Sequence, residues 1–117
     1  MAQYLLSVWH DEDYEIDFSS PDAQRQMAQV GEFNTELIDS GVFVFANGLE
    51  PRSSAVVASP ADGMLTDGPY AESKEHIGGF WVIDVPDFET ARSLVSKAAI
   101  ACETFVELRP FNVFEGE

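Results

Sequence analysis

The spacing of apolar residues along the chain predicts two helices and several short strands. Apolar residues three or four positions apart run from the helix-start signal Ser20-Pro21 to about Ser40, and again from the capping residue Asp87 to about Ala98. Short apolar runs with aromatic and β-branched residues predict the strands. They cover residues 4–9, 42–46, 55–58, 64–66, 78–85 and 104–113. Asp-Gly at 62–63 predicts a hairpin-type turn before the short stretch at 64–66.

The order of these elements predicts an α+β fold. A strand, a helix and a strand are followed by a hairpin, and then by a second strand, helix and strand. This order is typical of a ferredoxin-like unit with an inserted β-hairpin. The chain contains no repeat, low-complexity segment or linker, so residues 1–117 are expected to form a single domain.

Alternation along the central strands separates an apolar sheet face from a mixed one. The apolar set is Tyr4, Leu6, Val8, Trp81, Ile83, Val85, Val106 and Leu108. The mixed set is Leu5, Ser7, Trp9, Phe80, Val82, Asp84, Phe105, Glu107 and Arg109. Because two helices cover only one sheet face, the mixed face would stay exposed as a large apolar patch. We therefore expect a homodimer in which a second copy covers this face and a ligand site lies in the cleft between subunits.

Charge excludes two classes of partner. Acidic residues outnumber basic ones 21 to 6, which gives a formal net charge of −15. Nucleic-acid binding relies on Lys and Arg, and an anionic membrane surface repels so acidic a chain, so neither partner is expected. No apolar run approaches the roughly 20 residues that span a bilayer. The start of the chain lacks the features of a signal peptide, and its single cysteine, Cys102, permits no internal disulfide, so we expect a cytoplasmic protein.

Candidate chemistry lies on the mixed face and in the loop that precedes the strand at 78–85. The carboxylates of Glu107 and Asp84 are the candidate groups for general acid–base catalysis. The candidate ligand-binding residues are Trp9, Asp67, Tyr70, Lys74 and Arg109. In the alternative interpretation, Asp84, Glu107 and Arg109 are ordinary strand-end charges, the last two forming a same-face pair.

The sequence predicts neither a metal site nor a cofactor. His10, Asp11 and Asp13 lie close together, but their spacing matches no defined metal motif. His10 and His76 are instead interpreted as solvated loop residues. The chain has no Gly-rich phosphate loop, Cys cluster or nucleophile elbow, and Cys102, at the end of an apolar helix, is expected in the core.

One long motif carries a family resemblance. It reads Thr66-Asp67-Gly68-Pro69-Tyr70-Ala71-Glu72-Ser73-Lys74-Glu75, followed by Gly78-Gly79-Phe80 and Ile83-Asp84-Val85-Pro86-Asp87. Further agreements are Tyr4-Leu5-Leu6 with Asp11-Glu12, Gly48-Leu49, and Val106-Glu107-Leu108-Arg109-Pro110. The chain resembles the YCII-related family nearly end to end, in the branch named for its Asp-Gly-Pro-Phe (DGPF) motif, with Tyr70 in place of the Phe. The resemblance implies a ferredoxin-like fold that dimerises into an α/β barrel.

The resemblance implies less about activity. The Asp-Gly-Pro-Phe branch mostly lacks an assigned activity, whereas some YCII-related relatives are enzymes that act on small aromatic or lactone-like molecules. Those enzymes carry a histidine on the first helix, at a position that falls near Val30 here, and this helix contains no histidine. The motif itself has two interpretations. As a structural turn, it uses Gly68 in an extended or left-handed conformation and presents Tyr70 to the core. As a binding loop, it offers the Tyr70 hydroxyl and the Lys74 ammonium to an anion.

The sequence is compatible with two functions, and it does not decide whether the protein is an enzyme. In the first, the protein binds or transforms a small anionic or aromatic molecule in a cleft of the dimeric barrel. In the second, it is a non-catalytic accessory or regulatory protein whose acidic surface docks a protein partner. A pocket in which Glu107, Arg109 and Tyr70 converge would favour the first function.

Overall fold

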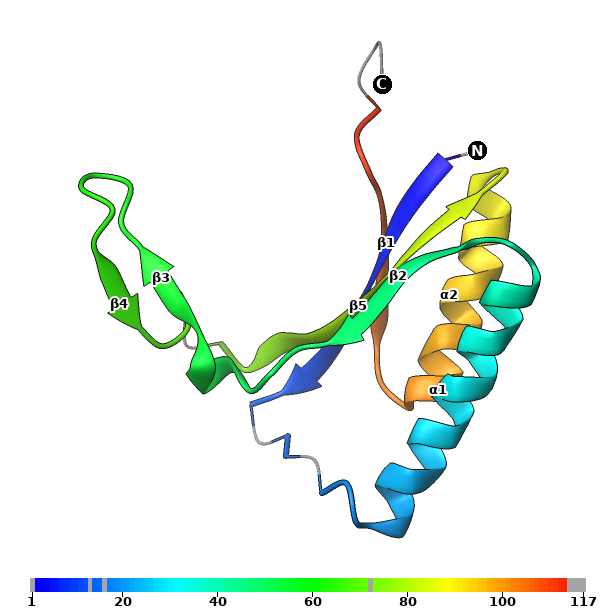
Figure 1. Ribbon diagram of the computed structural model, residues 1–117, viewed down its shortest axis with the longest axis horizontal. Helices are drawn as coiled ribbons and strands as arrows, with labels where there is room; N and C mark the ends of the chain where they lie inside the picture. The colour runs from blue at the N-terminus through cyan, green and yellow to red at the C-terminus, as the bar shows by residue number, and fades with distance from the viewer. Residues whose placement is uncertain (1, 13, 16, 72, 114–117) are drawn as a thin grey trace.

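A four-stranded antiparallel sheet carries two helices on one of its faces in the computed structural model, which describes residues 2–12, 14–15, 17–71 and 73–113 (Figure 1). The strands of this sheet are β1 (Ala2–Asp11), β2 (Phe43–Gly48), β5 (Glu75–Val85) and β6 (Val106–Pro110), in the order β2-β5-β1-β6. The helices are α1 (Pro21–Asp39) and α2 (Phe88–Cys102). Each helix links two strands that have a third strand between them. This arrangement is consistent with the predicted ferredoxin-like α+β fold.

Both helices begin at the predicted caps. The Ser20 hydroxyl accepts a hydrogen bond from the Ala23 amide at 3.1 Å, and the Asp87 carboxylate accepts one from the Thr90 amide at 2.8 Å. Such caps satisfy amides that the first helical turn leaves free. After α1, Gly41 takes a left-handed conformation with φ of 77°, as a glycine beyond a helix end commonly does.

Helix α2 continues one turn beyond Ala98, the last residue of the apolar spacing, and Cys102 lies at its end as expected. The helix ends at Glu103, which has a left-handed φ of 57°. The Glu103 carboxylate accepts hydrogen bonds of 2.8 Å from Arg25 and from Gln29 of α1. These hydrogen bonds join the end of α2 to the first half of α1. The spacing of apolar residues does not predict them, because they link polar side chains that are distant in the sequence.

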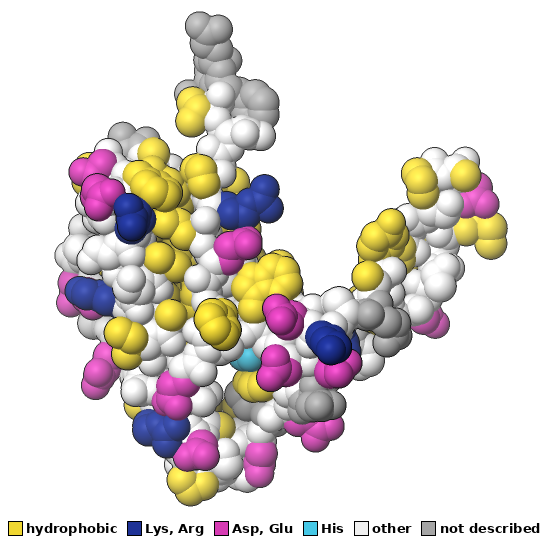
Figure 2. Space-filling view, turned by 180° about the vertical axis from the view of Figure 1, so that it is seen from behind, with side chains coloured by type: hydrophobic (Ala, Val, Ile, Leu, Met, Phe, Trp, Pro, Cys, Tyr) yellow, Lys and Arg dark blue, Asp and Glu magenta, His cyan; other side chains and the backbone are white. Residues whose placement is uncertain are grey.

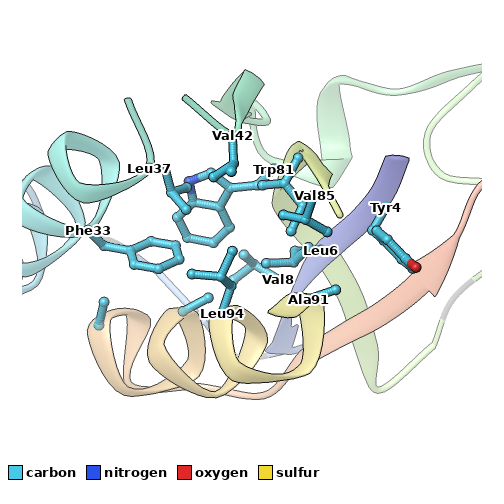
Figure 3. Close-up of a cluster of buried hydrophobic side chains, with 13 residues drawn as sticks. Tyr4, Leu6, Val8, Phe33, Leu37, Val42, Trp81, Val85, Ala91 and Leu94 are labelled. Carbon is cyan, nitrogen blue, oxygen red and sulfur yellow. The ribbon is translucent and has the colours of Figure 1, made fainter. Parts of the chain in front are cut away.

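The core lies between the helices and the apolar sheet face (Figure 3). The predicted inward set on β1 and β5 is confirmed, since all six of its side chains are buried: Tyr4, Leu6, Val8, Trp81, Ile83 and Val85. Phe33 and Leu37 of α1 and Leu94 of α2 pack against this layer. The Phe33 ring meets the Trp81 ring edge to face, with centroids 5.3 Å apart. Neither helix in the described residues has the length and apolar character needed to cross a membrane.

No helix among the described residues covers the opposite face of the sheet, so this part of the chain forms an open sheet rather than a closed barrel (Figure 1). We call it the open face; its residues are Leu5, Ser7, Trp9, Phe45, Phe80, Val82, Asp84, Phe105, Glu107 and Arg109. Phe105 is 87% exposed and Phe45 is 49% exposed. The rings of Phe45 and Phe80 lie 5.8 Å apart. The predicted apolar patch is therefore present in this protomer.

The predicted hairpin is confirmed, and it stands away from the rest of the molecule (Figure 1). We call residues 49–71 the arm. It contains a short 3₁₀ helix, η1 (Arg52–Ser54), and the antiparallel strands β3 (Val56–Ala58) and β4 (Leu65–Asp67). The turn between the strands includes Gly63 at a φ of 73°.

Candidate functional site

Two hollows lie on opposite sides of the sheet. The sheet-face hollow has a volume of about 480 Å³ and is lined by Trp9, Glu75, Phe105, Val106 and Glu107. The helix-side pocket has a volume of about 360 Å³ and lies between α1 and the ends of β2 and β5. Its lining residues are Val8, Val30, Asn34, Ala46, Asn47, Gly48, Gly78, Gly79, Phe80 and Trp81.

The sheet-face hollow brings two of the predicted site residues together. Trp9 and Glu107 both line it, and the Trp9 indole donates a hydrogen bond of 3.0 Å to the Ser7 hydroxyl. Arg109 and Asp84 share the open face but do not line the hollow. Glu107 and Arg109 form no ion pair in the described part of the chain, so their suggested pairing is not observed.

The other predicted ligand-binding residues lie on the arm or at its base. Asp67 ends β4, Lys74 precedes β5, and both are exposed. Tyr70 is 90% exposed, so the expectation that the motif presents it to the core is wrong. The turn itself is confirmed, because Gly68 has a φ of 99° and its amide donates to the Ala55 carbonyl at 2.7 Å. Within one protomer these residues do not line either hollow.

One side-chain amide, that of Asn34, gives the helix-side pocket its polar character. The Asn34 oxygen accepts a hydrogen bond of 2.7 Å from the Trp81 indole, so the NH₂ group is left as the free donor of this amide. Asn47 pairs with Phe80 and lies two positions after Phe45, so its side chain is on the open face and its backbone lines the pocket. The lining contains no charged residue. The pocket is therefore suited to a ligand that presents hydrogen-bond acceptors and an apolar or aromatic body.

Two adjacent glycines on β5 shape one wall of this pocket. A Cβ at Gly79 would lie 3.0 Å from the Asn47 carbonyl oxygen, so glycine allows the end of β2 to pack closely here. A Cβ at Gly78 would lie 2.7 Å from His10 Nε2 and still closer to its Cδ2. Gly78 is skipped in the pairing of β1 with β5, as in a β-bulge. The His10 ring thus occupies the space beside a residue that lines the pocket.

The interpretation of His10 and His76 as solvated loop residues is wrong, because the two residues pair with each other across β1 and β5. His10 is the titratable group nearest this wall of the pocket. It lies on β1 and is partly buried, and its ring stacks on Tyr14 with centroids 3.7 Å apart. The His76 ring lies 6.2 Å away across the strand pair. Loss of hydration first, and then the neighbouring His76, lower the pKa of His10 below 6.5, against a smaller opposite effect of Asp11. The imidazole is therefore mostly neutral at pH 7 and can accept a proton.

Sequence reasoning missed Asn34 because it searched for charged groups. Asn34 lies four positions after Val30 and three before Leu37, so it is a polar residue on the buried stripe of α1. His10 continues the inward alternation of Tyr4, Leu6 and Val8, a signal that the acidic run after it obscured.

Cys102 is confirmed as a residue packed against the core. Burial raises the pKa of its thiol to about 11, so the reactive thiolate is scarce at neutral pH. Among the described residues, no group of three or more His, Cys, Asp or Glu side chains is placed to hold a metal ion. The combination of His10, Asp11 and Asp13 includes Asp13, which lies outside the described residues.

The lowered pKa of His10 predicts how stability responds to acid. Because the fold favours the neutral ring, this contribution is complete above pH 6.5 and is lost as the pH falls toward the folded-state pKa. The Tm of the natural protein should therefore fall relative to that of His10→Gln between pH 7.5 and 5.5. Thermal unfolding of both proteins across this range measures the difference; a constant difference would contradict the assignment.

The chain is similar to a known protein family and to a protein of another organism. The family model described as YCII-related domain matches residues 2–114. An uncharacterized protein of Rhizobium meliloti (strain 1021) is 26% identical over 90 residues, which cover 75% of this chain and 73% of that protein.

Proposed function

Because the chain belongs to the YCII-related family, we propose that it is a single YCII-related domain that binds a small molecule in the helix-side pocket. The observation that carries this proposal is the lining itself, which combines the Trp81 ring with the side-chain amide of Asn34 and with backbone groups at the ends of β2 and β5. Ligand pockets are commonly about 300–1,000 Å³ and mostly apolar, with a few convergent polar groups. The helix-side pocket, at about 360 Å³, fits that description.

The chemistry of the lining selects a ligand class. The NH₂ group of Asn34 favours a carbonyl or carboxylate oxygen, and the indole of Trp81 favours a ring or another apolar body. Val30, the position that the resemblance assigns to the histidine of enzymatic relatives, lines the same pocket. If the protein is an enzyme, the candidate proton acceptor is the neutral ring of His10, which lies beside Gly78 of the lining without lining the pocket itself.

We further propose that the protein acts as a homodimer in the cytoplasm, joined through the open face into the α/β barrel that the family resemblance implies. The Asp84 carboxylate has a buried oxygen, Oδ1, without a hydrogen-bond donor in the described chain. Arg109 lies on the same face and takes part in no ion pair among the described residues. A two-fold interface is self-complementary, so Arg109 of each copy can meet Asp84 of the other. Two ion pairs would then flank the apolar centre of the interface.

The ligand proposal is tested with a substitution that removes the NH₂ donor of the Asn34 side chain and keeps its oxygen acceptor. Asn34→Asp keeps an oxygen to accept from the Trp81 indole, but it removes the NH₂ donor and adds a negative charge. Ring compounds that carry a carbonyl or carboxylate should raise the Tm of the natural protein in a thermal-shift screen. The affinity of a confirmed ligand for Asn34→Asp should be at least about tenfold weaker, the effect of roughly 1.4 kcal/mol.

The matched control is Asn112→Asp, which makes the same chemical change at an exposed position near the end of the described chain. This variant should bind the ligand like the natural protein. Equal binding by both variants would remove Asn34 from the site, and a screen without any thermal shift would count against a small-molecule function.

The alternative function, docking of a basic protein partner, is favoured by the charge distribution. Three of the six cationic side chains already lie in surface ion pairs with acidic neighbours, namely Arg25, Arg92 and Lys97. Most of the acidic excess is therefore left for an external partner. Binding of a basic partner should weaken steeply with salt. A ligand that binds the helix-side pocket at any salt concentration would favour the first function.

A further inference from the structure

The arm carries apolar side chains that its own protomer leaves exposed. They are Leu49, Val56, Met64, Leu65 and Tyr70, each between 53% and 90% exposed. The pairing of Ala58 with Leu65 places Leu65 and Val56 on the same side of the hairpin. A two-stranded hairpin is marginally stable at best in water without further packing. The arm therefore needs a cover to hold its structure.

The contacts between the arm and the body lie at the base of the arm. The Leu49 amide donates to the Gly78 carbonyl at 2.8 Å, and the Arg52 guanidinium donates to the Ser73 carbonyl at 2.7 Å. Beyond them, β3 and β4 pair with each other. Figure 2 shows hydrophobic side chains on the arm and on the body, on either side of an open gap.

We propose that the arm packs against a second copy of the chain and forms the outer part of the dimer interface. This inference rests on the homodimer proposed above, and it adds that the arm packs against the partner. Two-fold symmetry makes the contact reciprocal, so one association covers both arms and both open faces. The charges of Asp84 and Arg109 on the open face suit a second copy of that same face, which favours this occupant over an unrelated protein.

The area to be covered also points to a second copy. A stable interface buries about 800 Å² on each partner. Phe45 and Phe105 are the large apolar side chains most exposed on the open face; at about 150–250 Å² for a whole aromatic side chain, their exposed fractions of 49% and 87% supply roughly 200–340 Å². The arm adds five more exposed apolar side chains to the surface that a second copy can cover. An interface that includes the arm is therefore larger and more apolar than one formed by the open face alone.

Photocrosslinking from the arm tests the inference directly. A cysteine introduced by Met64→Cys can be labelled with benzophenone maleimide, since the natural thiol of Cys102 is largely buried and protonated. The labelled chain is mixed with ¹⁵N-labelled chain of natural sequence and irradiated. We expect a covalent product of about twice 12.9 kDa that contains ¹⁵N peptides. The matched control is Ser93→Cys on the exposed side of α2, which should give no such product.

A second variant keeps the inference testable without a label. Val56→Ser combined with Leu65→Ser removes apolar groups from one side of the arm and leaves the core unchanged. We expect the dimer dissociation constant to rise at least about tenfold while the far-UV circular dichroism is unchanged.

The outcomes separate the arm from the dimer itself. A dimer in light scattering that gives no crosslink from residue 64 and tolerates the double variant would overturn the arm contact and leave the open-face dimer standing. A monomer at micromolar concentration would overturn both. Crosslinking only to a different protein in cell extract would also overturn the inference, and none of these results bears on the helix-side pocket.

Discussion

Reversing the charge of Arg109 is expected to turn the proposed dimer into a monomer that remains folded. In Arg109→Glu, a carboxylate would face Asp84 of the other copy at a site already short of hydrogen-bond donors. Losing one partner of a desolvated charge pair typically costs about 2–5 kcal/mol, and like charges add to that cost. The dissociation constant should therefore rise roughly 100-fold or more. Light scattering on a size-exclusion column should show the mass falling toward 12.9 kDa.

The pairing itself is tested by restoring the opposite charge. Asp84→Lys combined with Arg109→Glu exchanges the two signs, so the double variant should recover the dimer that each single variant loses. The matched control is Arg92→Glu, which makes the same change at a surface residue of α2 that pairs with Glu89, and it should leave the mass unchanged. A dimeric Arg109→Glu, or a double variant that stays monomeric, would exclude this pair.

Gly78→Ala is expected to destabilise the fold through a single methyl group. The new Cβ would lie 2.7 Å from His10 Nε2, and stacking on Tyr14 limits how far that ring can move. Overpacking of this kind typically costs about 1–3 kcal/mol, which lowers the Tm of a chain this size by roughly 4–15 °C. Differential scanning calorimetry would measure the loss.

A double-mutant cycle isolates the cause. In a His10→Ala background the ring is absent, so Gly78→Ala should cost less than about 0.5 kcal/mol. Gly31→Ala provides a control that should stabilise the fold instead, because a Cβ there meets no atom within 4 Å. Since Ala is favoured over Gly in a helix by about 1 kcal/mol, Gly31→Ala should raise the Tm. An equal cost of Gly78→Ala with and without His10 would show that the ring is not the obstacle.

The parts of the fold that follow from local rules were predictable. Alternation placed Leu6 and Trp81 in the core, and the caps at Ser20 and Asp87 fixed the start of each helix. Contacts between distant segments leave no such signal. The hydrogen bonds that join the end of α2 to α1 link Glu103 to Gln29 and Arg25, 74 and 78 positions away in the chain.

The site was harder to predict than the fold, for a similar reason. Charged and reactive residues are the usual site candidates in a sequence, whereas the helix-side pocket is built from the Asn34 amide, the Trp81 ring and the backbone of Asn47 and of the glycines. The acidic run after His10 suggested a loop, yet β1 continues through this residue because β5 begins earlier than expected and pairs with it. Tyr70 lies in a motif whose local turn was predictable, while its exposure depends on the arm standing away from the body.

The two tryptophans of the chain lie one in each hollow, which gives the molecule a pair of built-in optical probes. Trp81 is buried and hydrogen-bonded to Asn34, so its fluorescence emission reports on the helix-covered side of the sheet. Trp9 lies on the other side, beside Phe105 and Glu107, where a second copy would displace water. With Trp9→Phe the remaining emission follows the helix-side pocket, and with Trp81→Phe it follows association. Ligand entry and dimer formation can thus be followed separately, in solution and without an added dye.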